Sequence, residues 1–210
     1  MDEQTSGLTA LILAAGPALR WGGDISKQLM QVPGTAETIL GRMIRQAETR
    51  GAYPVVVTRN LAIQDTGCVF YEPENYEVTC DTLASTRPLW KRRTIVLLGD
   101  VVYSKAAMDA VFAFTGDIGV FGNKGEIFAL SFSDAVHERV LDALAIGRTH
   151  RSGKLRFFYR AYMGWSPGTI KIDDVVYRWV LDWTMDVDSV PWYGNLCLLA
   201  NDGVIDDLPE

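Results

Sequence analysis

The chain has 210 residues, of which 48% are hydrophobic and 22% are charged. This balance is typical of a folded globular protein that buries a substantial core without disulfide or metal support. The formal net charge of −6 opposes broad, non-specific binding to nucleic acid, because that binding depends on many Lys and Arg contacts to phosphates. An anionic substrate must therefore be held locally, by a few cations, a metal ion or backbone N–H groups.

The remaining composition excludes several other classes. The three cysteines are scattered and the two histidines add no ligand cluster, so neither a disulfide framework nor a zinc site is expected. The first residues are polar and acidic, unlike a signal peptide, and the apolar stretches are too short to span a bilayer. We expect a cytoplasmic protein that binds neither nucleic acid nor a membrane. Assembly into a homo-oligomer is left open by the sequence.

Short apolar runs alternate with segments of helical spacing. The first run, Leu8 to Leu13, is followed by Ala14, Ala15 and Gly16, and its length and the glycine favour a buried strand. Near the end of the chain, Ser189 suits a helix cap and Pro191 a first helical turn. The expected strands are residues 8–13, 53–58, 68–71, 94–99, 117–121 and 126–132. The expected helices are residues 37–50, 79–90, 104–114, 133–147 and 190–200.

This alternation predicts an α/β fold, with a mainly parallel, mixed central sheet flanked by helices in a Rossmann-like arrangement. In such sheets, ligands bind beyond the carboxyl ends of the strands. The turn after the first strand is rich in small residues and is followed by Arg20 and Lys27. Small residues let backbone N–H groups approach a phosphate chain closely, and the two cations supply compensating charge. The commoner phosphate motifs are absent, so the loop alone indicates an anion site or a Gly-rich connection with two solvated cations.

The wider pattern around this loop is more specific. It reads L-A-A-G-x-x-x-R-x-G, then K-x-L-x-x-V-x-G, then L-x-R, and it resembles the opening of the GT-A-like nucleotidyltransferase superfamily. This superfamily includes sugar-1-phosphate nucleotidyltransferases, phosphocholine and methylerythritol cytidylyltransferases, and molybdenum-cofactor guanylyltransferases. The matching residues are Leu13, Ala14, Ala15, Gly16, Arg20, Gly22, Lys27, Leu29, Val32, Gly34, Leu40 and Arg42.

The resemblance implies a GT-A fold and a Mg²⁺-dependent enzyme. Such an enzyme moves a nucleoside monophosphate from an NTP to a small phosphorylated acceptor, with a sugar 1-phosphate favoured, and releases pyrophosphate. It further implies that Arg20 and Lys27 are catalytic and that the backbone from Leu13 to Gly16 holds the nucleotide. We expect one nucleotidyltransferase domain over residues 1–210, with an acceptor-side subdomain at roughly 122–185.

Asp100 directly follows the apolar run 94–99, which places its carboxylate at the ligand edge of the sheet. Taken alone, the position of Asp100 slightly favours a residue that caps the turn before Ser104 over a residue that binds a hard cation. In the superfamily, however, the Asp of the matching L-x-G-D-x pattern binds Mg²⁺. The resemblance therefore implies that Asp100 is a metal ligand.

Asp186 and Asp188 are two residues apart, so on an extended segment both carboxylates face the same way and could share one ion. Alternatively, Asp188 only caps the final helix. Many relatives have acidic residues here that complete the metal site. This sequence keeps D-V-D but lacks the Glu-Asp that follows in those relatives, which leaves open which aspartate is the ligand.

Two further segments have two interpretations each. Residues 76–85 resemble the part of the relatives that contacts base and sugar, through Thr82 and Ser85, or they form an ordinary amphipathic helix. Residues 148–160 are basic and aromatic. They have two interpretations: a segment that binds the acceptor phosphate or covers the site, or a surface that is solvated or contacts another subunit. We favour the surface, because runs of charge usually lie there.

Two other functions fit the same sequence. A GT-A-type glycosyltransferase would use a nucleotide sugar and a metal-binding carboxylate pair, but it gives no reason for Arg20 and Lys27 around a triphosphate. A non-catalytic nucleotide-binding relative would explain the departure after Asp188, but not the retention of Arg20, Lys27 and Asp100.

Overall fold

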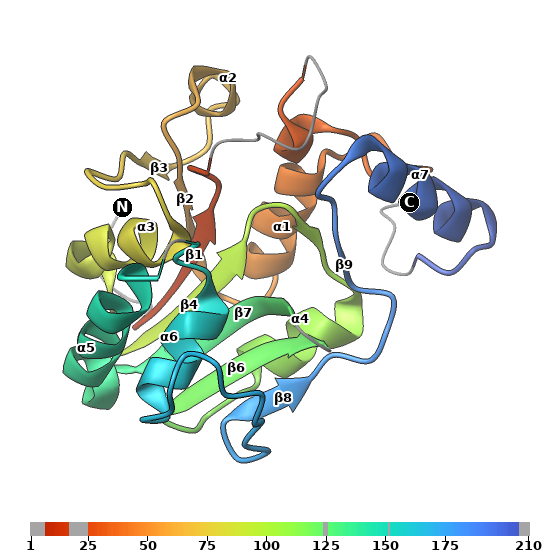
Figure 1. Cartoon of the computed structure of the whole chain (residues 1–210). Helices are drawn as coiled ribbons and strands as arrows, with labels where there is room; N and C mark the ends of the chain where they lie inside the picture. Colours follow the sequence, from red (N-terminus) through yellow and green to blue (C-terminus); the bar gives the residue numbers. More distant parts are fainter. Residues whose placement is uncertain (1–6, 17–24, 124–125, 151, 206–210) are drawn as a thin grey trace.

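The structure is a computed structural model that describes residues 7–16, 25–123, 126–150 and 152–205 (Figure 1). Its strands are β1 (Leu8–Leu13), β2 (Tyr53–Val57), β3 (Phe70–Tyr71), β4 (Arg93–Leu98), β5 (Val101–Val102), β6 (Ile118–Asn123), β7 (Glu126–Ser133), β8 (Tyr177–Trp179) and β9 (Met185–Asp186). Its α-helices are α1 (Ile39–Glu48), α2 (Leu61–Gln64), α3 (Thr79–Ser85), α4 (Lys105–Phe112), α5 (His137–Arg148), α6 (Leu155–Tyr162) and α7 (Val190–Asn201). Short 3₁₀ helices cover Lys27–Leu29, Arg87–Leu89 and Asp134–Val136.

Seven strands form one mixed sheet in the order β3-β2-β1-β4-β7-β6-β8. Strands β1, β2, β3 and β4 are mutually parallel, whereas β7 runs antiparallel to both β4 and β6. The amino end of β7 therefore lies at the same edge as the carboxyl ends of β1 and β4. The predicted mainly parallel, mixed sheet is confirmed.

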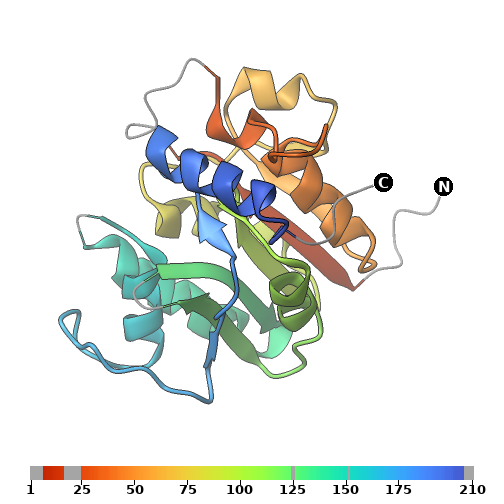
Figure 2. The same ribbon diagram turned by 90° about the vertical axis from the view of Figure 1, so that its right-hand side faces the viewer.

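Helices cover both faces of this sheet, as Figures 1 and 2 show. On one face α3, α5 and α6 pack on a core that includes Leu11 and Val96. On the other face α1 and α4 pack on a core that includes Ile12, Ile95 and Leu97. Successive strand residues point to opposite faces, and both faces here are buried, which explains why these strands are continuous apolar runs.

The sequence pattern missed some elements and extended one helix too far. The helix expected at 79–90 ends at Ser85, because Pro88 lacks an N–H and disfavours the helical conformation of the residue before it. Helix α6 begins inside the basic segment 148–160, for which no element was expected, and ends at Tyr162. Strands β8 and β9 were also missed, since two or three residues are too few to show an alternating pattern.

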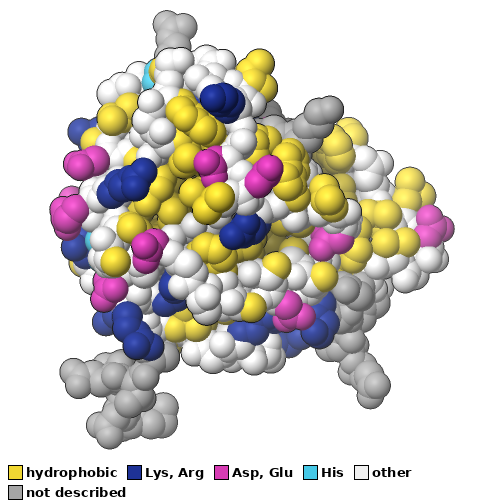
Figure 3. Space-filling model, turned by 90° about the horizontal axis from the view of Figure 1, so that it is seen from below, with side chains coloured by type: hydrophobic (Ala, Val, Ile, Leu, Met, Phe, Trp, Pro, Cys, Tyr) yellow, Lys and Arg dark blue, Asp and Glu magenta, His cyan; other side chains and the backbone are white. Residues whose placement is uncertain are grey.

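The edge of the sheet at β8 is apolar and open to solvent. Figure 3, which looks at the molecule from below the view of Figure 1, shows hydrophobic side chains gathered on this side among scattered charges. The exposed large side chains near β8 are Ile170, Ile172, Val175, Trp179 and Leu181.

No helix in the described part of the chain is long and apolar enough to cross a membrane.

Gly147 lets α5 and α6 approach closely. A Cβ atom at this position would lie 2.9 Å from the Phe158 backbone nitrogen and 3.0 Å from the Cys80 sulfur. We expect Gly147→Ala to lower the free energy of unfolding by about 1–3 kcal/mol, the usual cost of overpacking a core. Urea denaturation followed by circular dichroism measures this change.

The matched control is Gly194→Ala in α7, where nothing lies within 4 Å of the added Cβ atom. Because alanine favours helix over glycine, this variant should be as stable as the wild type or more stable, by up to about 1 kcal/mol. Equal destabilisation of both variants would contradict the close packing of α5 on α6.

Candidate functional site

The carboxyl ends of β1 and β4 meet closely and place Asp100 beside the first turn of the chain. The backbone N–H of Gly99 donates to the carbonyl oxygen of Leu13 at 2.9 Å. A Cβ atom on Gly99 would lie 2.7 Å from that oxygen and 3.1 Å from the Ala14 Cβ atom. Only glycine allows this approach, so Asp100 follows directly from the point where the two strands touch.

A small second sheet brings the distant acidic segment to the same place. Strand β5 pairs antiparallel with β9, with Val101 opposite Asp186. The Val187 N–H also donates to the Asp100 carbonyl oxygen at 2.8 Å. Asp186 and Asp188 thus lie next to Asp100, although more than eighty residues separate them in the sequence.

Hydrogen bonds fix the residues that lead into β9. The Ser104 hydroxyl donates to an Asp182 carboxylate oxygen at 2.5 Å, and the Ser104 N–H donates to the Thr184 hydroxyl at 3.0 Å. The Thr184 N–H in turn donates to Asp182 at 2.8 Å. These bonds hold the acidic segment against the start of α4 and so set the position of β9.

Three carboxylates and one ammonium group converge at this point. One oxygen each from Asp100, Asp186 and Asp188 lies within 4.8 Å of the other two. Lys27, which opens a 3₁₀ helix, places its Nζ atom 2.6 Å from Asp100 Oδ2 and 3.4 Å from Asp188 Oδ1. Lys27 is only 8% exposed, so this contact is largely shielded from solvent.

The electrostatics of the cluster follow from burial and from like charges. Burial by itself lowers the pKa of Lys27, but the adjacent Asp100 carboxylate, with smaller contributions from Asp186 and Asp188, raises the pKa above its ordinary value. Burial together with the charges of Asp100 and Asp188 raises the pKa of Asp186 to about 7. Lys27 therefore stays protonated, whereas the Asp186 carboxylate ionises only at a cost.

These carboxylates fit a divalent cation. Asp186 Oδ1 is buried without a hydrogen-bond partner in the described structure, and buried polar atoms of this kind usually have one. Carboxylate oxygens are the ligands that Mg²⁺ prefers, and a cation among the three aspartates would relieve both the unsatisfied oxygen and the repulsion.

The predicted nucleotide-binding residues fall into two groups. Leu13 and Ala14 are buried and their backbone is paired, since Ala14 N–H donates to the Val57 carbonyl at 2.8 Å. Ala15 is half-buried and Gly16 is exposed at the same edge as Asp100. Arg20 lies outside the described residues. The roles predicted for these residues and for Lys27 stay predictions, but Lys27 and the three aspartates do come together.

Thr82 and Ser85 lie within α3, and their hydroxyl groups bond to its own backbone. Thr82 donates to the Val78 carbonyl at 3.2 Å, and Ser85 donates to the Thr82 carbonyl at 2.7 Å. Thr79, at the start of the same helix, instead lines the cavity that holds the aspartates. A base or sugar contact by Thr82 and Ser85 stays a prediction.

Sequence reasoning missed one wall of this cavity, whose volume is about 110 Å³. Lys154 and Arg156, which the sequence favoured as solvated surface, line it together with the aspartates. Other parts of the basic segment do face outward: Arg148 pairs with Asp81 at 3.8 Å, and Arg160 donates to the Pro167 carbonyl. The pattern of charge alone could not separate these groups, because the unpredicted helix α6 decides which side chains turn inward.

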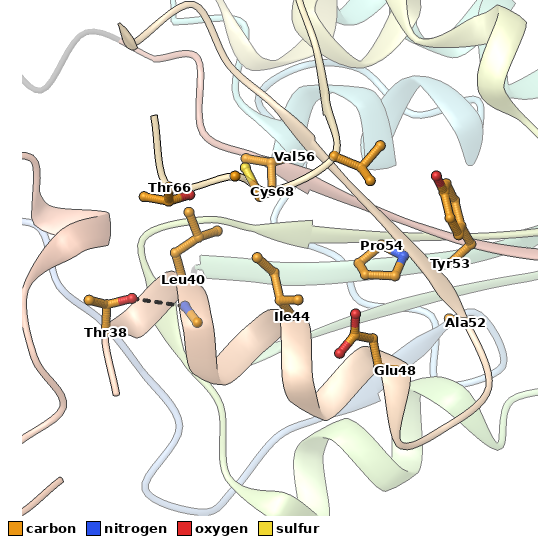
Figure 4. A pocket seen from close by; sticks show the side chains of 13 residues that line it. Thr38, Leu40, Ile44, Glu48, Ala52, Tyr53, Pro54, Val56, Thr66 and Cys68 are labelled. Atoms are coloured by element: carbon orange, nitrogen blue, oxygen red, sulfur yellow. Dashed lines mark hydrogen bonds between the residues drawn. The ribbon is translucent and has the colours of Figure 1, made fainter. Parts of the chain in front are cut away.

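A second cavity, of about 450 Å³, lies between α1, β2 and the residues before β3 (Figure 4). Its wall is mainly apolar, with Leu40, Ile44, Pro54 and Val56 facing the space, and Glu48 is its one charged residue. It contains no cation that would hold a phosphate chain. The candidate site is therefore the cavity at the carboxyl edge of the sheet.

Comparison with known proteins identifies the fold. No family model and no curated protein matches the sequence. The structure is similar to that of UDP-glucose pyrophosphorylase complexed with UDP-glucose, with a TM-score of 0.64 and 11% identity over 93% of this chain and 98% of that chain. It is also similar to the CTP:phosphocholine cytidylyltransferase of Streptococcus pneumoniae, with a TM-score of 0.63 and 13% identity over 92% and 99% of the two chains.

A third similar structure is a Bacillus anthracis protein assigned as a glucose-1-phosphate thymidylyltransferase, with a TM-score of 0.61 and 14% identity over 93% and 96% of the two chains. The chain has a nucleotidyltransferase fold. The fold that the sequence resemblance implied is thereby confirmed, and this chain spans nearly the whole length of each similar structure. At 11–14% sequence identity, the structural similarity shows the fold but does not identify the substrate.

The raised pKa of Asp186 predicts a pH-dependent stability. Its folded-state pKa of about 7 lies above the unfolded value, so the protonated group favours folding at low pH, and that contribution declines as the pH rises toward 7. In chelator at pH 8, Asp186→Asn should therefore raise the free energy of unfolding by about 1–2 kcal/mol, with a smaller gain at pH 5. Urea denaturation at both pH values measures the difference.

Addition of Mg²⁺ should reverse this order, because it stabilises the wild type more than Asp186→Asn. The control is Asp202→Asn, an exposed carboxylate outside the cluster, which should change stability little at either pH. A variant Asp186→Asn that is less stable than the wild type in chelator at pH 8 would show that the three carboxylates do not repel one another as described.

Proposed function

We propose that the chain is a Mg²⁺-dependent nucleotidyltransferase that moves a nucleoside monophosphate from an NTP to a small phosphorylated acceptor, with release of pyrophosphate. One observation carries the proposal: the ammonium group of Lys27 lies within 2.6 Å of Asp100 and 3.4 Å of Asp188, at the ligand edge of a sheet with a nucleotidyltransferase fold. Cationic and acidic groups are both needed where a polyphosphate and a divalent cation bind together.

The reaction requires little covalent help from the protein. An oxygen of the acceptor phosphate forms a bond to the α-phosphorus of the NTP, the bond from that phosphorus to the β-phosphate oxygen breaks, and pyrophosphate leaves with the electron pair. The attacking oxygen is already ionised at neutral pH, so no general base is needed. Catalysis then consists of positioning and of neutralising negative charge.

The residues of the site fit these two tasks. Lys27 is a compact, protonated point charge that would hold the phosphate chain as charge moves to the leaving group. Asp100, Asp186 and Asp188 would hold Mg²⁺, which supplies charge neutralisation and orientation of phosphate oxygens when bound. The backbone of Ala15 and Gly16 would approach the nucleotide, and Arg20, with Lys27, would hold the leaving pyrophosphate.

Removal of the Lys27 charge tests the assignment. With Mg²⁺, a panel of NTPs and a panel of phosphorylated acceptors, Lys27→Met should lower the rate of pyrophosphate release by about 10²–10³-fold, the usual effect of losing one preorganised charged group. A coupled pyrophosphate assay measures the rate, and circular dichroism checks that the variant folds.

Lys91→Met is the matched control, because Lys91 is exposed and lies before β4, at the opposite end of this strand from Asp100. It should keep the wild-type rate. If Lys27→Met folds and releases pyrophosphate at near the wild-type rate, the role of Lys27 is wrong.

The two other functions are separated by what the protein consumes. A glycosyltransferase would use nucleotide sugars and release no pyrophosphate from an NTP. A non-catalytic relative would bind a nucleotide without turnover with any acceptor. A thermal-shift panel of the common NTPs with Mg²⁺ identifies the preferred base, because the tightest ligand raises the apparent stability most. Sugar 1-phosphates are the first acceptors to test.

A further inference from the structure

Lys27 contacts the aspartate cluster from behind the wall of the cavity. Its Nζ atom lies 2.6 Å from Asp100 Oδ2 and 3.4 Å from Asp188 Oδ1, and its side chain is only 10% exposed. Among the described residues, the three aspartates line the cavity and Lys27 does not. The side chains of Asp100 and Asp188 are 27% and 20% exposed. A cation that enters the cavity therefore meets carboxylates that already have a partner.

One ammonium group satisfies this cluster only in part. Lys27 carries a single positive charge and donates to Asp100 and Asp188. Asp186 Oδ1 is buried and has no hydrogen-bond partner in the described structure. One oxygen from each of the three aspartates lies within 4.8 Å of the other two, so a divalent cation could bind all three. Such an ion would balance more charge than Lys27 does and would give Asp186 a partner.

The same oxygen atoms cannot serve both cations equally well. Mg²⁺ binds carboxylate oxygens at about 2.1 Å, so an ion on Asp100 Oδ2 would lie at most about 5 Å from the Lys27 Nζ atom. The repulsion between a divalent ion and an ammonium group is twice that between two single charges at the same distance. This repulsion favours the exchange of one cation for the other.

The Lys27 side chain can leave the cluster without a change in the backbone. Backbone hydrogen bonds from Leu29 to Ser26, at 2.8 Å, and from Met30 to Lys27, at 3.2 Å, hold the 3₁₀ helix that Lys27 opens. A lysine side chain is a flexible four-carbon stem. The aspartates, in contrast, are held in place by the pairing of β5 with β9. Movement of one side chain is therefore enough for the exchange.

We propose that Lys27 is an internal counter-ion of the aspartate cluster, which a divalent cation displaces when it binds. Lys27 thereby weakens metal binding to the free protein, and its ammonium group, once released, can hold the phosphate chain. The inference rests on the proposed function, which places the metal among these aspartates and assigns the phosphate chain to Lys27. It adds that the metal frees the cation that the nucleotide needs, so the two ligands bind cooperatively.

Binding of Mn²⁺ alone tests the exchange without nucleotide or turnover. Mn²⁺ accepts the same carboxylate oxygens as Mg²⁺, and electron paramagnetic resonance measures the free ion. Lys27→Met should bind Mn²⁺ about 10- to 100-fold more tightly than the wild type, within the usual range of coupling between two ligands. Lys27→Arg, which keeps a positive charge at this position, should show no such gain. Asp186→Asn should bind Mn²⁺ more weakly than the wild type, since it removes one of the three carboxylates.

Lys154→Met is the matched control for charge. Lys154 lines the same cavity, but its side chain is 37% exposed and lies 4.0 Å from the Glu126 carboxylate. Loss of this charge should tighten Mn²⁺ binding by no more than about 3-fold, because solvent screens exposed charges. A gain as large as that of Lys27→Met would mean that only the net charge of the cavity matters, and it would overturn the exchange.

A crystal structure of the wild type with Mn²⁺ keeps the inference testable if Lys27→Met does not fold. The anomalous signal locates the ion, which should lie among the three aspartates, with the Lys27 ammonium group beyond hydrogen-bond distance of Asp100 and Asp188. An ion bound by these aspartates while Lys27 Nζ stays 2.6 Å from Asp100 Oδ2 would overturn the inference.

Failure of the proposed function looks different. A wild type that binds Mn²⁺ but releases no pyrophosphate with any NTP and acceptor contradicts the proposed function, and the Mn²⁺ affinities still decide the inference. Equal Mn²⁺ affinities of the wild type and Lys27→Met overturn the inference and leave nucleotidyl transfer untouched. If neither protein binds Mn²⁺, the inference and the metal site of the proposed function are both wrong.

Discussion

The ammonium group of Lys27 lies between carboxylates that come from separate parts of the chain, 73 and 161 residues away in sequence. Asp100, Asp186 and Asp188 carry like charges within 4.8 Å of one another, and such a group repels itself unless a cation is close. Lys27 is that cation in the described structure. Lys27 thereby offsets part of the repulsion where the end of β4 and the segment around β9 share one edge of the sheet. Burial, together with the charges of Asp100 and Asp188, still raises the pKa of Asp186 to about 7, so one lysine does not offset these effects fully.

Backbone contacts, rather than these charges, bring the segments together. Gly99 allows β4 to touch the end of β1, and the β5–β9 pair delivers Asp186 to the residue after Asp100. Ser104, through Asp182, holds the segment before β9. The unfavourable cluster is thus supported by hydrogen bonds that are independent of it. Functional sites often contain locally unfavourable interactions, and the surrounding structure compensates for their cost in stability.

The sequence predicted the sheet and the charged residues at its edge because both leave local signals. Buried parallel strands are continuous apolar runs, and Asp100 directly follows one of them. Lys27 and the loop before it match, residue by residue and in the same order, the motif that resembles the opening of the nucleotidyltransferase superfamily. Helix α6 did leave a signal that the charge run obscured, because its buried residues recur at helical spacing: Leu155, Phe158, Tyr159 and Tyr162. Lys154 and Arg156 were therefore grouped with Arg148 and Arg160, although only the first two line the cavity. Strand β9 was missed because its pairing is tertiary and covers two residues.

If the proposed function is right, the distribution of charge explains how an acidic chain can bring two polyanions together. A triphosphate and a phosphorylated acceptor repel each other and the aspartates, and this repulsion strengthens as the ligands exclude water. One cationic group on the carboxylate side could hold only one of the two. Lys27 on one wall, with Lys154 and Arg156 on the other, places positive charge on both sides of the cavity. Gly153 packs against Val78, just before α3, so the fold fixes the backbone that carries Lys154 and Arg156 before any ligand binds. Such preorganisation suits a reaction whose barrier is mainly the approach of two anions.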